Sequence, residues 1–468
     1  MLPRSTTEMQ GIKSSAILQF IERGERTIDD LHSVMLLRHG RVITEGWWAP
    51  YAEQTPHELY SLSKSFASTA IGIAIAEGRL GLDDTVTSFF DQSDLPAEPG
   101  ANLQAMRIRD LLSMNSGHQD DTEHRLSVED GRWSRAFLHL NVEHKPGTHF
   151  VYNTGATYML SAILQKTTGQ RLIDYLRPRL FDKLGIKNPS WQQSPEGVDL
   201  GGWGLRITTE DIARFGLLYL QRGVWNGERI LSKEWVADAS SRQTSNGSNP
   251  RSDWEQGYGY QFWRCRHNSY RGDGAFGQYC IIMPDQDAVL AITSGTEDMQ
   301  AVLNLVWEEL LPNMTDAPLN ADMETERKLA TKLDSLQLPP QQGKISSAIA
   351  RRVSGMQYDV NDNEELLETI SFKFEPETVY YMRRAATDYR IPIGRDTWAI
   401  SDQGEMGKIA ASGAWESEDT YILKVYYCET PYCSVQHFRF NEDLFVLNEE
   451  FNVSFGKRVR PQRTGTVR

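Results

Sequence analysis

Ser61 and Lys64 are the sharpest chemical feature of the sequence, because they stand three positions apart where an extended segment gives way to a helical pattern. On a helix, residues i and i+3 share a face, so the Ser61 hydroxyl and the Lys64 amine can meet. A serine hydroxyl is a weak nucleophile near neutral pH, and an amine whose pKa is lowered by burial can serve as its base. The pair predicts nucleophilic catalysis; the alternative is a helix N-cap beside a solvated lysine.

The same spacing recurs at Ser454 and Lys457. That segment alternates like a strand, and in a strand an odd offset sends two side chains to opposite faces. No dyad is expected there. The spacing of Ser61 and Lys64 therefore indicates catalysis only in combination with the surrounding segments.

Four segments, in order along the chain, resemble the motifs of the serine β-lactamase and penicillin-binding-protein superfamily, in its class C β-lactamase, DD-peptidase and family VIII esterase branch. They are YSLSKSF (60–66) with GRLGLDD (78–84), IRDLLSMNSG (108–117), PGTHFVYNTG (146–155), and GG (201–202) with TTEDIARF (208–215). The resemblance covers about residues 10–312. It implies an α/β fold in which an antiparallel sheet is flanked by helices and carries an inserted helical domain.

The resemblance implies catalytic roles for three residues. Ser61 matches the nucleophile, Lys64 the lysine of the first motif, and Tyr152 the tyrosine of the Tyr-x-Asn motif. A phenol near an ammonium can lose its proton more easily, so Lys64 or Tyr152 could be the working base, and this choice stays open. If the resemblance holds, the backbone N–H groups of Ser61 and Ala275 form the oxyanion hole.

Two positions depart from the family pattern. Thr154 stands where the family has asparagine, with Asn153 adjacent, so recognition of a substrate amide is expected to weaken. Gly272-Asp273-Gly274 replaces the cationic third motif, unless Arg271 or His267 substitutes. A neutral or cationic substrate is therefore favoured over an anionic β-lactam. The residues expected to bind substrate are Thr154, Asp273, Gly274, Trp203, Tyr258 and Phe276.

The elements that must position these residues follow from hydrophobic periodicity. A hairpin is expected at 33–48 and a helix at 61–78, and several helices precede further strands. The later elements are helices at 109–114, 156–168, 172–184 and 208–221, strands at 257–265, 278–283 and 288–293, and a helix at 298–311. We expect a hydrolase domain at 1–312, with the helical part inserted at about 66–250.

The C-terminal part has a different pattern. Proline-rich residues 313–344 are typical of a linker. Beyond residue 345 the apolar period is two, as in Phe372 and Phe374 or Val425 and Tyr427. Residues 345–468 are therefore predicted to form a separate antiparallel β domain, a small barrel or curled sheet. This domain is expected to pack against the hydrolase domain, to cap its cleft or to mediate self-association.

Composition limits the partners of the protein. The 468 residues carry a net charge of -14, which argues against nucleic acid or an anionic membrane as the main partner. No apolar run is long enough for a signal peptide or a membrane span, so a cytoplasmic protein is expected. Cys428 and Cys433 flank a hairpin-like turn, but four cysteines make no disulfide framework and no metal-ligand spacing accompanies them. Neither a metal nor an organic cofactor is expected.

The sequence thus predicts a serine hydrolase that acts on an ester or amide, including a D-amino-acid or small-peptide amide, through an acyl-enzyme on Ser61. A β-lactamase or DD-peptidase proper is one alternative. The other is a non-catalytic protein that keeps the fold and binds a peptide or a cell-wall fragment, an alternative motivated by the altered second and third motifs.

Overall fold

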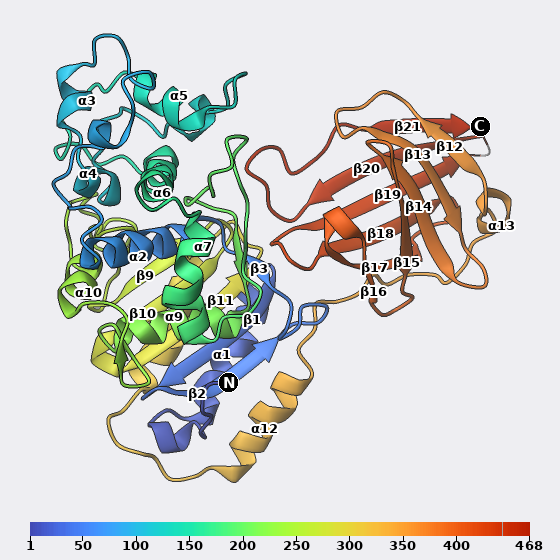
Figure 1. The fold of residues 1–468 in the computed structure, drawn as a ribbon. Helices are drawn as coiled ribbons and strands as arrows, with labels where there is room; N and C mark the ends of the chain where they lie inside the picture. The colour runs from blue at the N-terminus through green and yellow to red at the C-terminus, as the bar shows by residue number, and fades with distance from the viewer. Residues whose placement is uncertain (442) are drawn as a thin grey trace.

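An antiparallel sheet of six strands organises the N-terminal half of the protein in residues 1–441 and 443–468, which the computed structural model describes (Figure 1). Its strand order is β2-β1-β11-β10-β9-β8. The strands are β1 (Leu31–Arg38), β2 (Arg41–Trp47), β8 (Trp263–Arg264), β9 (Tyr270–Gly274), β10 (Gln278–Met283) and β11 (Ala288–Ser294). The hairpin predicted at 33–48 is confirmed, because β1 pairs with both β2 and β11.

Most helices of this half lie between the first two strands and the last four strands of the sheet in chain order, which confirms the expected fold class. They are α2 (Ser63–Ala76), α3 (Ala101–Ala105), α4 (Ile108–Leu112), α5 (Trp133–His139), α6 (Thr154–Thr168), α7 (Leu172–Leu176), α8 (Asp182–Leu184), α9 (Thr209–Leu220) and α10 (Lys233–Ser240). We call this sheet with its helices the N-terminal body.

Both faces of the sheet are buried, and β1 is buried at every position. Met35 and Leu37 face the core that α2 and α9 share. Val34 and Leu36 face the opposite core, formed with α1 (Ser14–Thr27) and α11 (Met299–Leu305). Because side chains alternate along a strand, burial on both sides explains why residues 34–37 of β1 are apolar without a break.

The expected strand at 257–265 is wrong for most of its length. Only Trp263–Arg264 forms a strand, while Tyr258 makes isolated bridges. Gly257 and Gln261 have φ values of 108° and 64°, and such backbone turns the chain away from an extended path. Tyr258 and Trp263 instead pack against Tyr152, in the site described below.

Helix α2 is buried at every position from Ser63 to Ala74. A helix of this kind belongs inside a domain. Gly72 allows close packing, since a Cβ at that position would lie 2.2 Å from the Trp235 ring of α10. The helix that carries Lys64 is therefore held rigidly in the core. No helix among residues 1–441 and 443–468 is long and apolar enough to cross a membrane.

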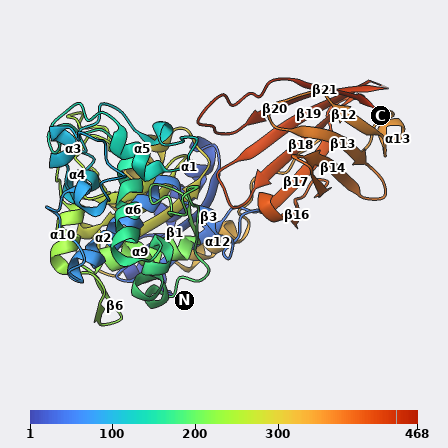
Figure 2. The ribbon, with the colours of Figure 1, turned by 45° about the horizontal axis from the view of Figure 1, so that its top comes forward.

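The C-terminal part forms a nearly closed antiparallel barrel of ten strands in the described residues, as the alternating pattern predicts (Figures 1 and 2). Aromatic rings fill it: Phe372 lies 4.9 Å from Phe438 and 4.7 Å from Tyr380, measured between centroids. The strands are β12 (Gln357–Val360), β13 (Leu367–Lys373), β14 (Thr378–Arg384), β15 (Thr387–Ile393), β16 (Ala399–Asp402), β17 (Lys408–Trp415), β18 (Thr420–Tyr427), β19 (Cys433–Asn441), β20 (Leu444–Phe451) and β21 (Arg463–Val467).

The connecting segment is anchored to the N-terminal body. Helix α12 (Met323–Asp334) packs against α1, and Lys332 forms an ion pair with Glu25 at 2.6 Å. Leu336 follows and accepts a hydrogen bond from the backbone N–H of Ala49. The barrel therefore begins from a fixed point beside the sheet.

A tight hairpin of the barrel makes the second connection between the two parts. The turn between β18 and β19, residues 428–432, contacts the segment that precedes Ser61. The Glu58 N–H donates to the carbonyl of Glu429 at 2.8 Å, and Tyr51 Oη donates to the carbonyl of Thr430 at 2.9 Å. The two cysteines that flank this turn are free and buried. The barrel thus touches the N-terminal body near its candidate nucleophile.

Candidate active site

Ser61 lies in a single 3-10 turn, Tyr60–Leu62, that leads directly into α2. The approach to this turn is fixed because β3 (His57–Glu58) pairs with β5 (Leu205–Ile207). The buried Glu58 carboxylate accepts hydrogen bonds from the N–H of Gly204 and from Arg206. Ser61 itself is half-buried, so its hydroxyl is held in place at the surface of the core.

Lys64 is placed against the Ser61 hydroxyl, as the spacing predicts. Its Nζ donates to Ser61 Oγ at 3.0 Å and to the carbonyl oxygen of Gly202 at 2.8 Å. The side chain of Lys64 is fully buried, and burial lowers its pKa to about 8. The negative charges of Asp121, Asp273 and Glu123 act in the opposite direction and limit this decrease. A substantial neutral fraction of this amine is therefore present at mildly alkaline pH.

Close packing explains why the second residue of the Gly201-Gly202 pair is a glycine. A Cβ on Gly202 would lie 2.8 Å from Cγ2 of Thr154 and 3.6 Å from Nζ of Lys64. A side chain there would clash with Thr154, while the distance to Nζ is an ordinary contact. Gly202 thus lets its carbonyl approach the lysine closely.

Tyr152 completes the cluster around the lysine. The Lys64 Nζ lies over its ring, 4.9 Å from the centroid, and the ring stacks on Trp263 at 5.1 Å. Burial raises the pKa of Tyr152 far above its ordinary value, Asp273 raises it further, and a hydrogen bond with the Ser61 side chain opposes both. The net direction is upward, the opposite of the easier proton loss expected beside an ammonium. The phenol stays protonated.

Asp121 is a member of the site that sequence reasoning missed. Its carboxylate accepts the N–H of Thr154 at 2.9 Å, at the start of α6, and its charge raises the pKa of Lys64. The signal was present, since Asp120 and Asp121 closely follow the Ser-Gly end of the second resembling segment. The pattern could not show that one of the two turns toward the lysine.

Asn153 does not replace the missing family asparagine. It is fully buried as the N-cap of α6, where its Oδ1 accepts from the N–H and hydroxyl of Thr122, and its Nδ2 donates to Ser116. Thr154 is half-buried and follows directly after it. The group available beside Tyr152 is therefore Thr154.

On β9, Asp273 is neutralised by Arg271 within the same buried face. The Arg271 Nε donates to Asp273 Oδ2 at 2.8 Å, and its guanidinium lies over the Trp254 ring at 4.4 Å. His267 packs against Trp307 instead, with ring centroids 5.4 Å apart. The guanidinium of Arg271 is committed to Asp273, so it does not stand in for the cation of the family's third motif.

The end of β9 lies against the turn that carries Ser61. A Cβ on Gly274 would stand 1.9 Å from the carbonyl oxygen of Leu59, so only glycine permits this approach. Ala275 follows in the β9–β10 turn and is half-buried. An oxyanion hole made by the N–H groups of Ser61 and Ala275 requires the two residues to be neighbours in space, and this packing brings their turns together.

The remaining residues expected to bind substrate differ in accessibility. Trp203 is half-buried, and its carbonyl accepts from Trp191 Nε1 at 2.8 Å. Tyr258 and Phe276 are buried, with exposed fractions of 1% and 7%. Tyr258 packs edge-on against Tyr152, at 6.1 Å between centroids. In this structure Tyr258 supports the ring of Tyr152.

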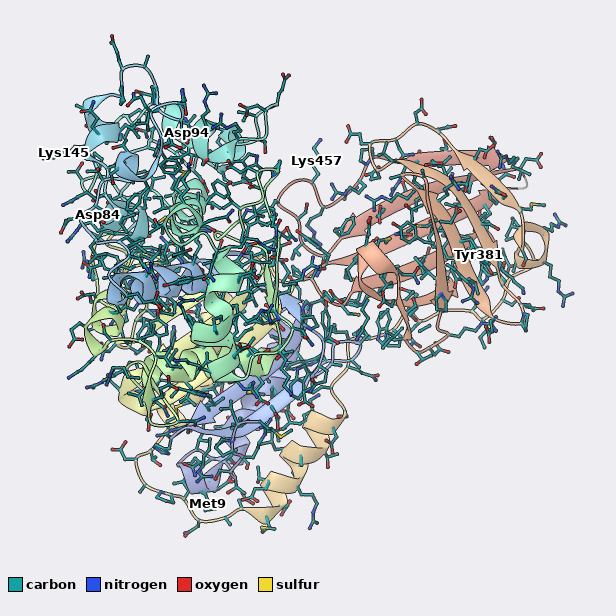
Figure 3. The ribbon with its side chains drawn as sticks, in the orientation of Figure 1. Met9, Asp84, Asp94, Lys145, Tyr381 and Lys457 are labelled. Carbon is teal, nitrogen blue, oxygen red and sulfur yellow. The ribbon has the colours of Figure 1, made fainter. Side chains whose placement is uncertain are left out.

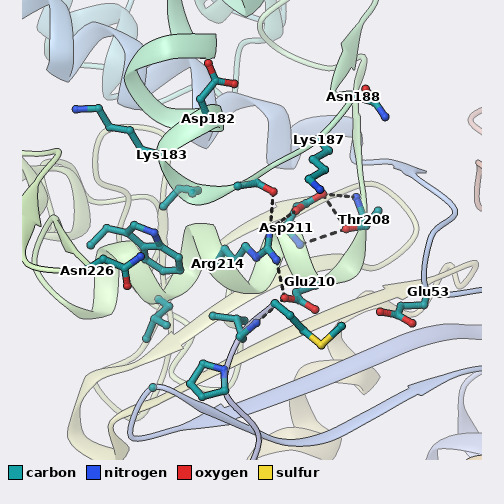
Figure 4. Close-up of a pocket in the computed structure, with 18 of the residues that line it drawn as sticks. Glu53, Asp182, Lys183, Lys187, Asn188, Thr208, Glu210, Asp211, Arg214 and Asn226 are labelled. Carbon is teal, nitrogen blue, oxygen red and sulfur yellow. Dashed lines mark hydrogen bonds and ion pairs between the residues drawn. The ribbon is translucent and has the colours of Figure 1, made fainter.

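A cavity of about 760 Å³ lies elsewhere, between the N-terminus and the start of α9 (Figure 4). None of the three candidate catalytic residues lines it. Its central cation, Arg214, is already bonded to Glu210 at 2.7 Å, to Asp211 at 3.3 Å and to the carbonyl of Gly185 at 2.6 Å. Arg214 and its two carboxylate partners thus satisfy one another within this cavity.

Comparison with known proteins agrees with this geometry. A family model described as Beta-lactamase matches residues 26–307. The chain belongs to the Beta-lactamase family. Among curated relatives of this Beta-lactamase family member, the 6-aminohexanoate-dimer hydrolase of Paenarthrobacter ureafaciens is 26% identical over 296 residues, covering 59% of this chain and 75% of that protein.

Two solved structures share the fold of this family member. A putative 6-aminohexanoate-dimer hydrolase from Bacillus anthracis aligns with a TM-score of 0.53 and 19% identity, covering 72% of this chain and 89% of that chain. The octameric penicillin-binding protein homologue from Pyrococcus abyssi aligns with a TM-score of 0.51 and 17% identity, covering 97% of this chain and 99% of that one. The second alignment extends across nearly the whole chain.

Proposed function

We propose that the protein is a serine hydrolase that cleaves an ester or amide through an acyl-enzyme on Ser61. The contact between Lys64 Nζ and Ser61 Oγ, at 3.0 Å, is the single observation that supports this most strongly. A buried amine with a lowered pKa beside a hydroxyl is the arrangement that nucleophilic catalysis needs. Membership of the Beta-lactamase family supports the same chemistry.

In the proposed reaction, neutral Lys64 takes the proton of Ser61 as Oγ forms a bond to the substrate carbonyl carbon. The N–H groups of Ser61 and Ala275 stabilise the resulting oxyanion. As the bond to the leaving group breaks, the Tyr152 phenol donates a proton to it and is reprotonated from Lys64. Water then attacks the acyl-enzyme by the same route and releases the acid. The raised pKa of Tyr152 fits a donor of protons better than a base.

A small neutral or cationic acyl compound is the substrate class that the site favours. Arg271 is paired with Asp273, while Asp121 and Glu123 place negative charge near Lys64. The similarity to a 6-aminohexanoate-dimer hydrolase supports an amide whose acyl part carries an ammonium. An anionic β-lactam fits this charge distribution less well.

Incubation with a fluorophosphonate probe tests the proposal. We expect labelling of wild-type protein, located to Ser61 by peptide mass analysis and absent in Ser61→Ala. Ser335→Ala, at an exposed serine beside α12, is the matched control and should label fully. Hydrolysis of a short p-nitrophenyl ester should follow labelling. Binding of such compounds with neither labelling nor turnover by wild type would contradict an enzyme and favour a binding protein.

A further inference from the structure

Four aromatic rings meet where the barrel touches the N-terminal body. Tyr60 and Phe276 come from the N-terminal body, and Tyr432 and Phe455 come from the barrel. Phe455 lies 4.7 Å from Phe276 and 5.5 Å from Tyr60, measured between ring centroids. Tyr432 lies 5.9 Å from Phe276, and Tyr60 Oη donates a hydrogen bond to Tyr432 Oη at 2.7 Å. We call these four residues the aromatic junction.

The two members from the N-terminal body each stand next to an oxyanion-hole candidate. Tyr60 directly precedes Ser61, and Phe276 directly follows Ala275. Both have left-handed backbone, with φ of 46° for Tyr60 and 66° for Phe276. For a bulky residue this conformation is strained and persists where the surroundings hold it.

Those two backbone conformations help to place the neighbouring N–H groups, one directly and one through a turn. A peptide plane is rigid, so the φ and ψ angles at Tyr60 orient the Ser61 N–H. Phe276 comes after Ala275 and acts on it differently: its left-handed conformation shapes the turn that holds Ala275, which the Gly277 N–H closes by donating to the Gly274 carbonyl at 3.2 Å. Ser294 assists on one side, because its Oγ donates to the carbonyls of Phe276 and Gly277 at 3.0 and 2.9 Å. The side chains of Tyr60 and Phe276 are held from the other side by the barrel.

The barrel reaches this place with two segments. The β18–β19 turn brings Tyr432, and its carbonyl at Glu429 accepts the Glu58 N–H. The loop after β20 brings Phe455. This loop, on which Figure 3 labels Lys457, extends toward the N-terminal body. Phe455 is 73% exposed although its ring contacts Tyr60 and Phe276. Such a residue contributes little to the core of the barrel.

We propose that the C-terminal barrel is a positioning element of the active centre. Tyr432 and Phe455 hold Tyr60 and Phe276 in their left-handed conformations, so that the N–H groups of Ser61 and Ala275 converge on one oxyanion. This inference rests on the proposed function, because it assigns the barrel a part in the same reaction. Tyr432 and Phe455 are positioning residues and touch no reacting atom.

The full-length protein with Phe455→Ala or Tyr432→Ala tests this inference with a p-nitrophenyl ester. We expect kcat to fall by roughly 10- to 100-fold, since a small misplacement of catalytic groups has such an effect, with KM within about twofold. Tyr432→Phe keeps the ring and should retain most of the activity. Tyr381→Ala, at a partly exposed aromatic on β14, is the matched control and should behave as wild type.

The outcomes separate this inference from the proposed function. Absence of turnover and of Ser61 labelling in wild type would overturn both. Wild-type rates in Phe455→Ala and Tyr432→Ala would overturn only the positioning role, while Ser61 chemistry stands. A rise in KM at unchanged kcat would also overturn it, because Phe455 would then bind substrate. Should Tyr432→Ala fail to fold, Phe455→Ala decides alone, since its exposed ring leaves little cavity.

Discussion

The Nζ atom of Lys64 lies over the face of the Tyr152 ring, 4.9 Å from the ring centroid. An aromatic face attracts a cation without removing the proton of the phenol. Burial lowers the pKa of Lys64 to about 8 and raises that of Tyr152. We therefore expect the lysine to lose its proton first, which makes Lys64 the base of the proposed reaction and Tyr152 the donor.

The pH dependence of kcat/KM should report Lys64. The base must be neutral, so the rate should rise as pH increases through about 8 and reach a plateau above it. Tyr152→Phe should lower the plateau by roughly 10²- to 10⁴-fold and keep the position of the rising limb. Initial rates with an acyl p-nitroanilide between pH 5 and 10 measure both, because its amine leaving group needs a proton. A limb that moves in Tyr152→Phe would instead assign the titration to the phenol.

Asp121→Asn should move the rising limb of the pH profile of kcat/KM toward lower pH. The Asp121 charge raises the pKa of Lys64, so its removal lets burial lower that pKa further. Asparagine keeps an oxygen that can accept the Thr154 N–H. The exposed neighbour Asp120→Asn is the matched control, and its limb should match that of wild type. If the rate rises at the same pH in Asp121→Asn and Asp120→Asn, the Asp121 charge does not act on Lys64.

The local elements of this fold could be predicted from sequence because they depend on near neighbours. The hairpin of β1 and β2, the turn into α2 and the alternation of the barrel strands each follow from periodicity and turn residues. The Ser61–Lys64 contact belongs to the same class, since one helical turn brings the two together.

Other features depend on contacts between distant segments. Asp121 reaches Lys64 because its loop packs at the start of α6, and Arg271 neutralises Asp273 because both side chains face the same buried side of β9. The strand expected at 257–265 fails because Gln261 adopts a left-handed conformation that periodicity does not encode. The aromatic junction joins residues 60 and 455, a pairing that no local pattern contains.

Asp273→Asn should destabilise the protein strongly. Arg271 is fully buried and paired with Asp273, so the variant leaves a buried charge without its counter-ion, at a cost of about 3–5 kcal/mol. Glu368→Gln is the matched control, because it breaks the exposed ion pair with Arg383, worth about 0–1 kcal/mol. Urea unfolding followed by tryptophan fluorescence measures both. Similar midpoints for the two variants would show that Arg271 does not need this carboxylate.

The buried pair His32 and His57 should make the protein less stable in acid. Their ring nitrogens lie 3.1 Å apart, and burial lowers the pKa of His57 from 6.5 to about 4 and that of His32 well below its ordinary value. The unfolded chain binds these protons first, so stability is full above pH 6.5 and is lost as pH falls toward 4. For His57 alone the loss approaches about 3 kcal/mol.

Thermal unfolding between pH 4 and 8 measures this effect. The pH dependence should be smaller in His57→Gln, while the exposed His139→Gln should keep the wild-type dependence. Parallel curves for wild type and His57→Gln would mean that other groups cause the acid sensitivity.

A series of p-nitrophenyl esters with equal acyl chain length tests the charge preference of the site. The hexanoyl, 6-aminohexanoyl and adipoyl esters end in a methyl, an ammonium and a carboxylate group. Because Asp121, Asp273 and Glu123 act on Lys64 while Arg271 is already paired, the carboxylate ester should have the lowest kcat/KM, by roughly tenfold or more. Added salt should narrow the difference by screening. A carboxylate ester hydrolysed fastest would require a free cation near Ser61, and Arg271 would then have to leave Asp273 when substrate binds.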